Sequence, residues 1–148
     1  ELLSGYAVDR RALIEQGSTL AQTPAGIVAL REVSVATVCP HHLMPGLGRA
    51  NVVYRPGARV LGLGAIARLV DACARRLVLQ ETIAEDVVAS LIELAGARGA
   101  YCEVTLVHGC LSARGACQTN ARATSIVRRG ELSESEVLLS LGLGGRPA

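Results

Sequence analysis

Two helical patterns that follow one another directly, with strand-like segments on both sides, most constrain the fold of this 148-residue chain. In residues 65–80, apolar side chains recur at helical spacing, and arginine and aspartate occupy the other side. A second helical pattern runs from about residue 82 to 98, with glycines near its end. Strand-like alternation flanks the pair, in residues 26–38 and 49–56 before it and in 100–108 and 118–129 after it. The sequence therefore predicts an α+β fold in which an antiparallel sheet carries the two helices on one face.

Shorter helices are expected near both ends of the chain. Asp9 can cap a helix over residues 8–16, which Gly17 stops, and residues 133–142 favour a C-terminal helix. Since neither an internal repeat nor a low-complexity tract divides the sequence, we expect one domain over residues 1–148. The chain opens at Glu1 without an initiator Met, so we also expect that an N-terminal segment is missing.

Composition narrows the class of protein. Phe and Trp are absent and only three Tyr are present, so Val, Leu, Ile and Ala must build the core. The formal charge of +2 arises from fifteen arginines and thirteen acidic residues without a basic stripe, which argues against a nucleic-acid partner. Neither an apolar run of membrane-spanning length nor a signal peptide appears, so we expect a soluble cytoplasmic protein.

All three histidines of the chain belong to two short motifs that also contain cysteine, "CPHH" at residues 39–42 and "HGC" at residues 108–110. Thiolate and imidazole are preferred zinc ligands, and a catalytic zinc site needs three of them and an open fourth position. Alternatively, Cys39 is a small buried side chain and the histidines cap a turn, or Cys117 completes a closed structural site. Cys73 and Cys102 lie in apolar patterns and are expected in the core.

Three blocks of sequence resemble the GTP cyclohydrolase I family, in the family's own order. They are "SVATVCPHHLMP", "NVVYRPGARVLGLGAIARLVDACARRLVLQE" and "VTLVHGCLSARGA". The corresponding family motifs read CEHHLLP, GLSKxxR followed by RLQVQERLT, and HxCMxxRG. The resemblance covers nearly the whole chain. It implies the tunnelling fold, a four-stranded antiparallel sheet backed by two long helices, in a ten-subunit ring with active sites between subunits.

The resemblance also implies an activity and assigns roles to particular residues. Family members open the imidazole ring of GTP by hydrolysis, release formate and form dihydroneopterin triphosphate. The matching positions are the zinc ligands Cys39, His42 and Cys110, the acid and base His41 and His108, the guanine-binding pair Gln80 and Glu81, and the phosphate-binding Arg68 and Arg114. Without the resemblance, Gln80 and Glu81 would be interpreted as a solvated helix end.

Several positions depart from the family motifs. Pro40 replaces the Glu of CEHH, and Gly64 and Ala65 replace the Ser and Lys of GLSK, which sit near the phosphates in the family. Val78 and Thr82 replace a Gln and an Arg near QE. These departures leave two alternatives to GTP hydrolysis. One is the same ring opening on a guanine- or pterin-type substrate with fewer or no phosphates, and the other is a non-catalytic purine- or pterin-binding regulatory protein.

Overall fold

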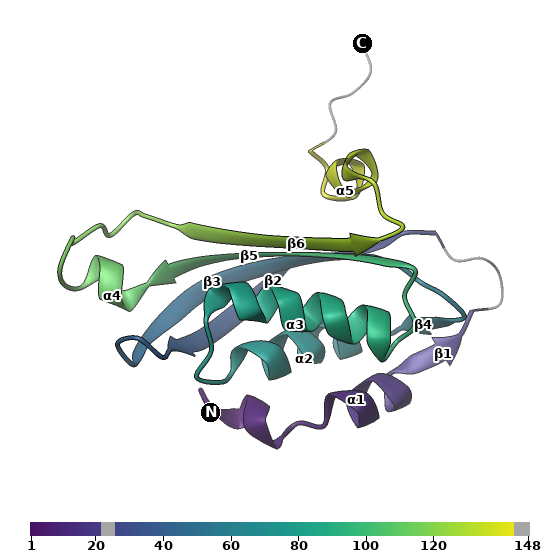
Figure 1. The fold of residues 1–148 in the computed structure, drawn as a ribbon, viewed down its shortest axis with the longest axis horizontal. Helices are drawn as coiled ribbons and strands as arrows, with labels where there is room; N and C mark the ends of the chain where they lie inside the picture. The colour runs from purple at the N-terminus through teal and green to yellow at the C-terminus, as the bar shows by residue number, and fades with distance from the viewer. Residues whose placement is uncertain (22–25, 144–148) are drawn as a thin grey trace, which may run out of the picture.

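The computed structural model describes residues 1–21 and 26–143, and its main element is a long four-stranded antiparallel sheet (Figure 1). The strands are β2 (Val28–Cys39), β3 (Met44–Arg55), β5 (Gly99–His108) and β6 (Ala123–Gly130). They lie in the order β2-β3-β5-β6, and every neighbouring pair is antiparallel. The hairpin that joins β2 to β3 therefore lies at the same end of the sheet as the C-terminal end of β5.

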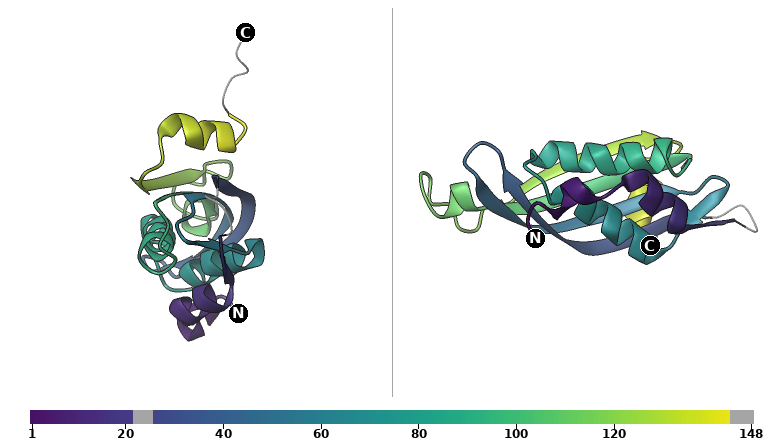
Figure 2. Two further views of the ribbon diagram at one scale, coloured as in Figure 1. Left: turned by 90° about the vertical axis from the view of Figure 1, so that its right-hand side faces the viewer. Right: turned by 90° about the horizontal axis from the view of Figure 1, so that it is seen from below.

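Two consecutive helices, α2 (Leu63–Ala74) and α3 (Gln80–Glu93), cover one face of this sheet (Figure 2). Their buried aliphatic side chains pack on the inward residues of the strands, among them Val52 and Leu106. Each fully buried side chain of this size contributes about 1.5–3 kcal/mol relative to exposure. The buried hydroxyl of Tyr54 accepts a hydrogen bond from the Leu61 backbone N–H at 3.0 Å, and burial raises the pKa of Tyr54. The predicted α+β fold is confirmed.

The opposite face of the sheet is covered at one end by α5 (Glu134–Ser140), above the sheet in Figure 1. Val137 and Leu141 pack there against Val53 and Tyr101 of the sheet. Because these apolar residues leave water together, α5 is held on a face that otherwise carries many polar side chains. This is the C-terminal helix that the sequence predicts over residues 133–142.

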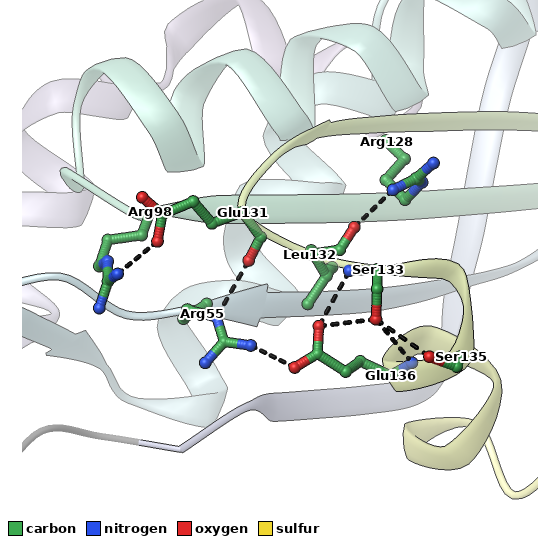
Figure 3. A network of polar contacts seen from close by, with 8 residues as sticks. All are labelled: Arg55, Arg98, Arg128, Glu131, Leu132, Ser133, Ser135 and Glu136. Atoms are coloured by element: carbon green, nitrogen blue, oxygen red, sulfur yellow. Dashed lines mark hydrogen bonds and ion pairs between the residues drawn. The ribbon is translucent and has the colours of Figure 1, made fainter.

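A network of polar contacts ties α5 to the strands (Figure 3). Ser133 and Glu136 form a capping box at the start of α5, and Arg55 of β3 pairs with the Glu136 carboxylate. Arg55 also donates a hydrogen bond from Nε to the Glu131 carbonyl at 3.0 Å. The backbone and hydroxyl of Ser133, followed by Arg55, lower the pKa of Glu136 to about 2. Glu136 is therefore an anion at neutral pH, as this network requires.

The N-terminal part of the chain lies below the helices in Figure 1, and together with a short strand after β3 it adds elements that the sequence predicts only in part. The elements are the 3-10 helix η1 (Ser4–Ala7), α1 (Arg10–Gln16), β1 (Ser18–Leu20) and β4 (Arg59–Leu61). Asp9 Oδ1 accepts hydrogen bonds from the N–H groups of Arg11 and Ala12, as expected for an N-cap. The small sheet of β1 and β4 was not expected, because three-residue strands carry too little alternation to be recognised.

The segment between α2 and α3 differs from the sequence-based expectation. The helix expected over residues 65–80 ends at Ala74, although Leu77 continues its apolar spacing. Instead, Leu77 forms a parallel bridge with Val38 of β2, and the Val78 N–H donates to the Val38 carbonyl at 3.2 Å. Pairing with β2 replaces the last helical turn and brings the start of α3 to the hairpin end of the sheet.

Two further differences concern the region after β5. The residues between the two strands expected over 100–108 and 118–129 begin with a short helix, α4 (Gly109–Ser112). The strand expected over residues 118–129 begins only at Ala123, where its backbone first pairs with β5. The intervening residues are mostly exposed, so they are available to contact other molecules.

Cys73 and Cys102 are fully buried in the apolar core, as the sequence predicts. Burial raises the pKa of the Cys73 thiol to about 11 and also raises that of Cys102. Both remain protonated thiols at neutral pH. Across the described parts of the chain, every helix is too short or too polar to cross a membrane.

Candidate functional site

One end of the sheet gathers segments that are far apart in the sequence. Cys39 and Met44 close the β2–β3 hairpin, and Gly46 of β3 pairs with His108 of β5. The α2–α3 link reaches the same end through its bridge to Val38. An added Cβ at Gly109 would lie 3.1 Å from the Pro45 carbonyl, so α4 packs closely on the hairpin. Both Cys- and His-containing motifs therefore lie at this end of the sheet.

Three predicted zinc ligands belong to these neighbouring segments. Cys39 is the last residue of β2 and is buried, whereas Cys110 in α4 is half-buried. His42 lies in the exposed hairpin turn, which is closed by a hydrogen bond from the Leu43 N–H to the Cys39 carbonyl at 2.9 Å. Leu43 takes a left-handed conformation with φ 53°, a strained arrangement for a bulky residue.

The donor set suits zinc, because two thiols and an imidazole are ligands that zinc prefers. Within residues 1–21 and 26–143, however, no three Cys, His, Asp or Glu side chains converge closely enough to hold a metal ion. The fold thus brings Cys39 and Cys110 to one end of the sheet, where His42 lies exposed in the hairpin turn.

The two predicted acid–base histidines are in different environments. His41 lies exposed beside His42, with 6.3 Å between the ring centroids. His108 is half-buried on the side of the sheet that the helices cover, and its Nε2 lies 2.7 Å from Gln80 Oε1. His108 is therefore fixed in place by the protein, whereas His41 lies in an exposed turn.

Gln80 and Glu81 begin α3 but face different surroundings. Gln80 is 4% exposed and donates hydrogen bonds from Nε2 to the carbonyls of Val104 and Ala123, both at 2.8 Å. Glu81 is exposed in the first turn of the helix. The interpretation as a solvated helix end fits Glu81 only, since Gln80 is part of the interior. This difference had no signal in the sequence.

The two predicted phosphate-binding arginines are not brought together in the chain. Arg68 is exposed on α2 and lines a groove of about 310 Å³ beside Val33 and Ser34 of the outer strand β2. Arg114 lies in the exposed segment after α4. Thr37 of β2 pairs with Gly46 and so marks the hairpin end of the sheet. Val33 lies four residues before Thr37, which is about 13 Å along an extended strand. Arg68 is thus displaced from the hairpin end of the sheet.

The position where the family carries Lys has a structural role here. Ala65 is 2% exposed, and a Cβ added to Gly17 at the end of α1 would lie 2.4 Å from the Ala65 Cβ. Ala65 is thus buried against Gly17, so a longer side chain at residue 65 would have to displace α1. By contrast, the position of Gly64 is open, since an added Cβ there would meet no atom of the described residues within 4 Å. The packing of α1 on α2 therefore fixes a small side chain at residue 65.

Comparison with known proteins points to one family. Residues 1–140 match the model of the family described as GTP cyclohydrolase I. The GTP cyclohydrolase 1 of Leifsonia xyli is 38% identical over 148 residues, which cover 97% of this chain and 78% of the relative. A GTP cyclohydrolase 1 of Campylobacter lari is 33% identical over 135 residues, covering 91% of this chain and 70% of the relative.

Solved structures with the same fold include an archaeosine synthase QueF-like protein in its apo form. It matches with a TM-score of 0.58 and 17% identity over 75% of this chain and all of that chain. A dihydroneopterin aldolase from a Burkholderia species, bound to guanine, matches with a TM-score of 0.50 and 17% identity over 73% of this chain and 93% of that chain. At this identity, both matches support the tunnelling fold and nothing further.

Proposed function

Since this chain belongs to the GTP cyclohydrolase I family, whose members are hydrolases acting on a cyclic amidine, we propose that it hydrolyses the imidazole ring of GTP. The products are formate and dihydroneopterin triphosphate. The observation that carries this proposal is that Cys39, Cys110 and the anchored His108 all lie at the same end of the sheet. Incubation with GTP, followed by ultraviolet spectra and formate analysis, tests it directly.

We further propose that the enzyme depends on zinc, held by Cys39, His42 and Cys110. When bound there, zinc would supply a hydroxide near neutral pH that can attack the ring carbon. The two cysteines already lie at one sheet end, and the exposed turn after Cys39 can reorient to bring His42 inward. The strained backbone at Leu43 supports such a rearrangement.

His41 and His108 would move protons during ring opening. Cleavage of the carbon–nitrogen bond leaves an amine nitrogen that must gain a proton, and attack by water releases one. Imidazole serves both needs near neutral pH, since its two protonation states have similar free energies there. His108 suits this task because its ring is held by a hydrogen bond at 2.7 Å.

Glu81 would select the guanine base, because its exposed carboxylate can accept hydrogen bonds from the ring N–H and the amino group. In Glu81→Gln, one acceptor becomes a donor, which leaves a hydrogen-bond donor of the bound base unpaired. We expect a loss of about 1–3 kcal/mol in binding, or roughly 5- to 150-fold in KM or Kd. Glu93→Gln, the same change at the exposed far end of α3, is the matched control. Equal affinity of wild type and Glu81→Gln for guanosine would place Glu81 outside the site.

We also propose that the enzyme is a homo-oligomer, a ten-subunit ring as in its family, with each site completed by a second copy of the chain. The separation of Arg68 from the hairpin end supports this arrangement, since a neighbouring copy can carry its own Arg68 to that end. When neighbouring copies contact each other through two different surfaces and the chain of contacts closes into a ring, the same shared site occurs at every such interface.

Mixing two inactive variants tests whether the site is shared. Arg68→Glu and His108→Ala chains should each have low activity alone, and their co-assembled mixture should recover about a quarter of the wild-type activity, because one site in four then combines both intact residues. Native mass spectrometry confirms that mixed assemblies form. Mixed assemblies without recovered activity would show that Arg68 and His108 serve the same site from one chain.

Hydrolysis of a substrate with fewer phosphates remains a second candidate, favoured by one observation. A buried Ala65, packed against Gly17, stands at the position where the family carries a lysine. A purine nucleoside or its monophosphate would need less positive charge than GTP. Steady-state rates with GTP, GMP and guanosine separate the two candidates.

A further inference from the structure

Gln80 has every hydrogen of its side-chain amide engaged inside the protein. Its Nε2 donates one hydrogen bond to the Val104 carbonyl of β5 and the other to the Ala123 carbonyl of β6, both at 2.8 Å. A primary amide has two N–H groups, so these contacts use all of its donors. Gln80 therefore has none left with which to recognise a purine.

These two carbonyls also fix which way the amide faces. A backbone carbonyl can only accept, so the terminal atom that faces both of them must be nitrogen, and the oxygen must face His108. Oε1 lies 2.7 Å from His108 Nε2. Because an amide oxygen cannot donate, the proton in this hydrogen bond belongs to His108 Nε2. The chemical identity of the bonding partners thus fixes which nitrogen of His108 carries the proton.

The other ring nitrogen of His108, Nδ1, is left open to the outside. None of the hydrogen bonds among the described residues uses Nδ1, and none of their side-chain nitrogen or oxygen atoms is both buried and unpaired. Nδ1 of the half-buried His108 must therefore reach the surface. On another side of the ring, Gly46 allows close packing, since an added Cβ would lie 3.4 Å from His108 Cε1.

We propose that Gln80 is a positioning residue that keeps a proton on Nε2 of His108 and thereby presents Nδ1 as the atom that exchanges protons with the substrate. This inference rests on the proposed function, in which His108 carries a proton during ring opening. Nδ1 accepts a proton released by the attacking water and later returns it to the amine nitrogen freed when the carbon–nitrogen bond breaks. The ring gains no net proton over the cycle, and the Gln80 oxygen stabilises the imidazolium formed in between.

Nitrogen-15 NMR of protein labelled only at histidine tests the proton position without any variant. The chain has only three histidines, of which His41 and His42 are exposed, so the His108 ring signals can be assigned. In magic-angle-spinning spectra of the full chain, we expect Nε2 to be protonated and dipolar-coupled to Gln80, with Nδ1 unprotonated or protonated in addition. A proton on Nδ1 alone would overturn the proposal. This result does not depend on whether GTP is the substrate.

Gln80→Met keeps the length of the side chain and removes its hydrogen bonds. We expect the protected Nε2–H signal to be lost and kcat to fall about ten-fold or more, while KM changes by less than about two-fold. Ser90→Ala is the matched control, because Ser90 is another buried polar residue of α3 and accepts a hydrogen bond from Arg10 at 3.3 Å. Ser90→Ala should leave the His108 signals unchanged. A raised KM with unchanged kcat and unchanged His108 signals would instead place Gln80 against the substrate and overturn the proposal.

Discussion

Replacing Cys110 by Ala should remove the bound zinc and the activity together, because Cys110 is one of only three ligands that the proposed site takes from the chain. His108→Ala should keep one zinc per subunit and lower turnover about a hundred-fold or more, the usual contribution of a proton carrier. Metal analysis of the purified variants, together with formate release from GTP, measures both effects.

Cys117→Ala provides the control for this pair. Cys117 lies exposed in the segment after α4, close to Cys110 in sequence, and is the fourth ligand of the alternative closed structural site. We expect Cys117→Ala to retain zinc and activity. Loss of zinc in Cys117→Ala would favour the structural site, and equal loss in His108→Ala and Cys110→Ala would make His108 a ligand. Metal-free wild-type protein with full activity would exclude a catalytic zinc.

Charge reversal at Arg114 should abolish the preference for phosphorylated substrates. If GTP is the substrate, kcat/KM should fall steeply from GTP through GMP to guanosine, because each charged hydrogen bond contributes about 1.5–3 kcal/mol. In Arg114→Glu, kcat/KM for GTP should drop at least about ten-fold, while that for guanosine should stay nearly constant. The measurement is a set of steady-state rates with the three substrates.

Arg122→Glu is the matched control for this prediction, since it makes the same charge reversal in the same exposed region. A comparable effect of both variants would indicate a general electrostatic field rather than a contact from Arg114. A flat gradient in the wild type would favour the substrate with fewer phosphates. That outcome would agree with the presence of Ala65, packed against Gly17, where the family carries a lysine.

The arrangement of the sheet and the two central helices could be predicted from the sequence, because alternation and helical spacing are local properties. The end of α2 could not be predicted. Leu77 fits the helical spacing, and only its bridge to Val38, far away in sequence, shows why the helix stops at Ala74. The strands β1 and β4 were missed for a related reason, since each depends on a partner about forty residues away.

Residue types and motifs suggested the candidate site residues, but not their surroundings. The neighbouring pair Gln80 and Glu81 carries no sequence signal that one is buried and the other exposed. The role inferred for Gln80 depends on the carbonyls of Val104 and Ala123, and backbone carbonyls are the same in every residue. Such contacts depend on which strands lie next to α3, so they cannot be predicted from the identities of the side chains.

The anchoring of Gln80 also bears on when the site forms during folding. Its three partners lie 24, 28 and 43 residues further along the chain, on β5, at the end of β5 and at the start of β6. Contacts of this sequence separation require the closure of long loops and form late compared with a local hairpin. A chain that has folded only the β2–β3 hairpin and the two helices would therefore contain the CPHH motif but no oriented His108. Competence for proton transfer would then arise in the same cooperative step that adds β5 and β6 to the sheet.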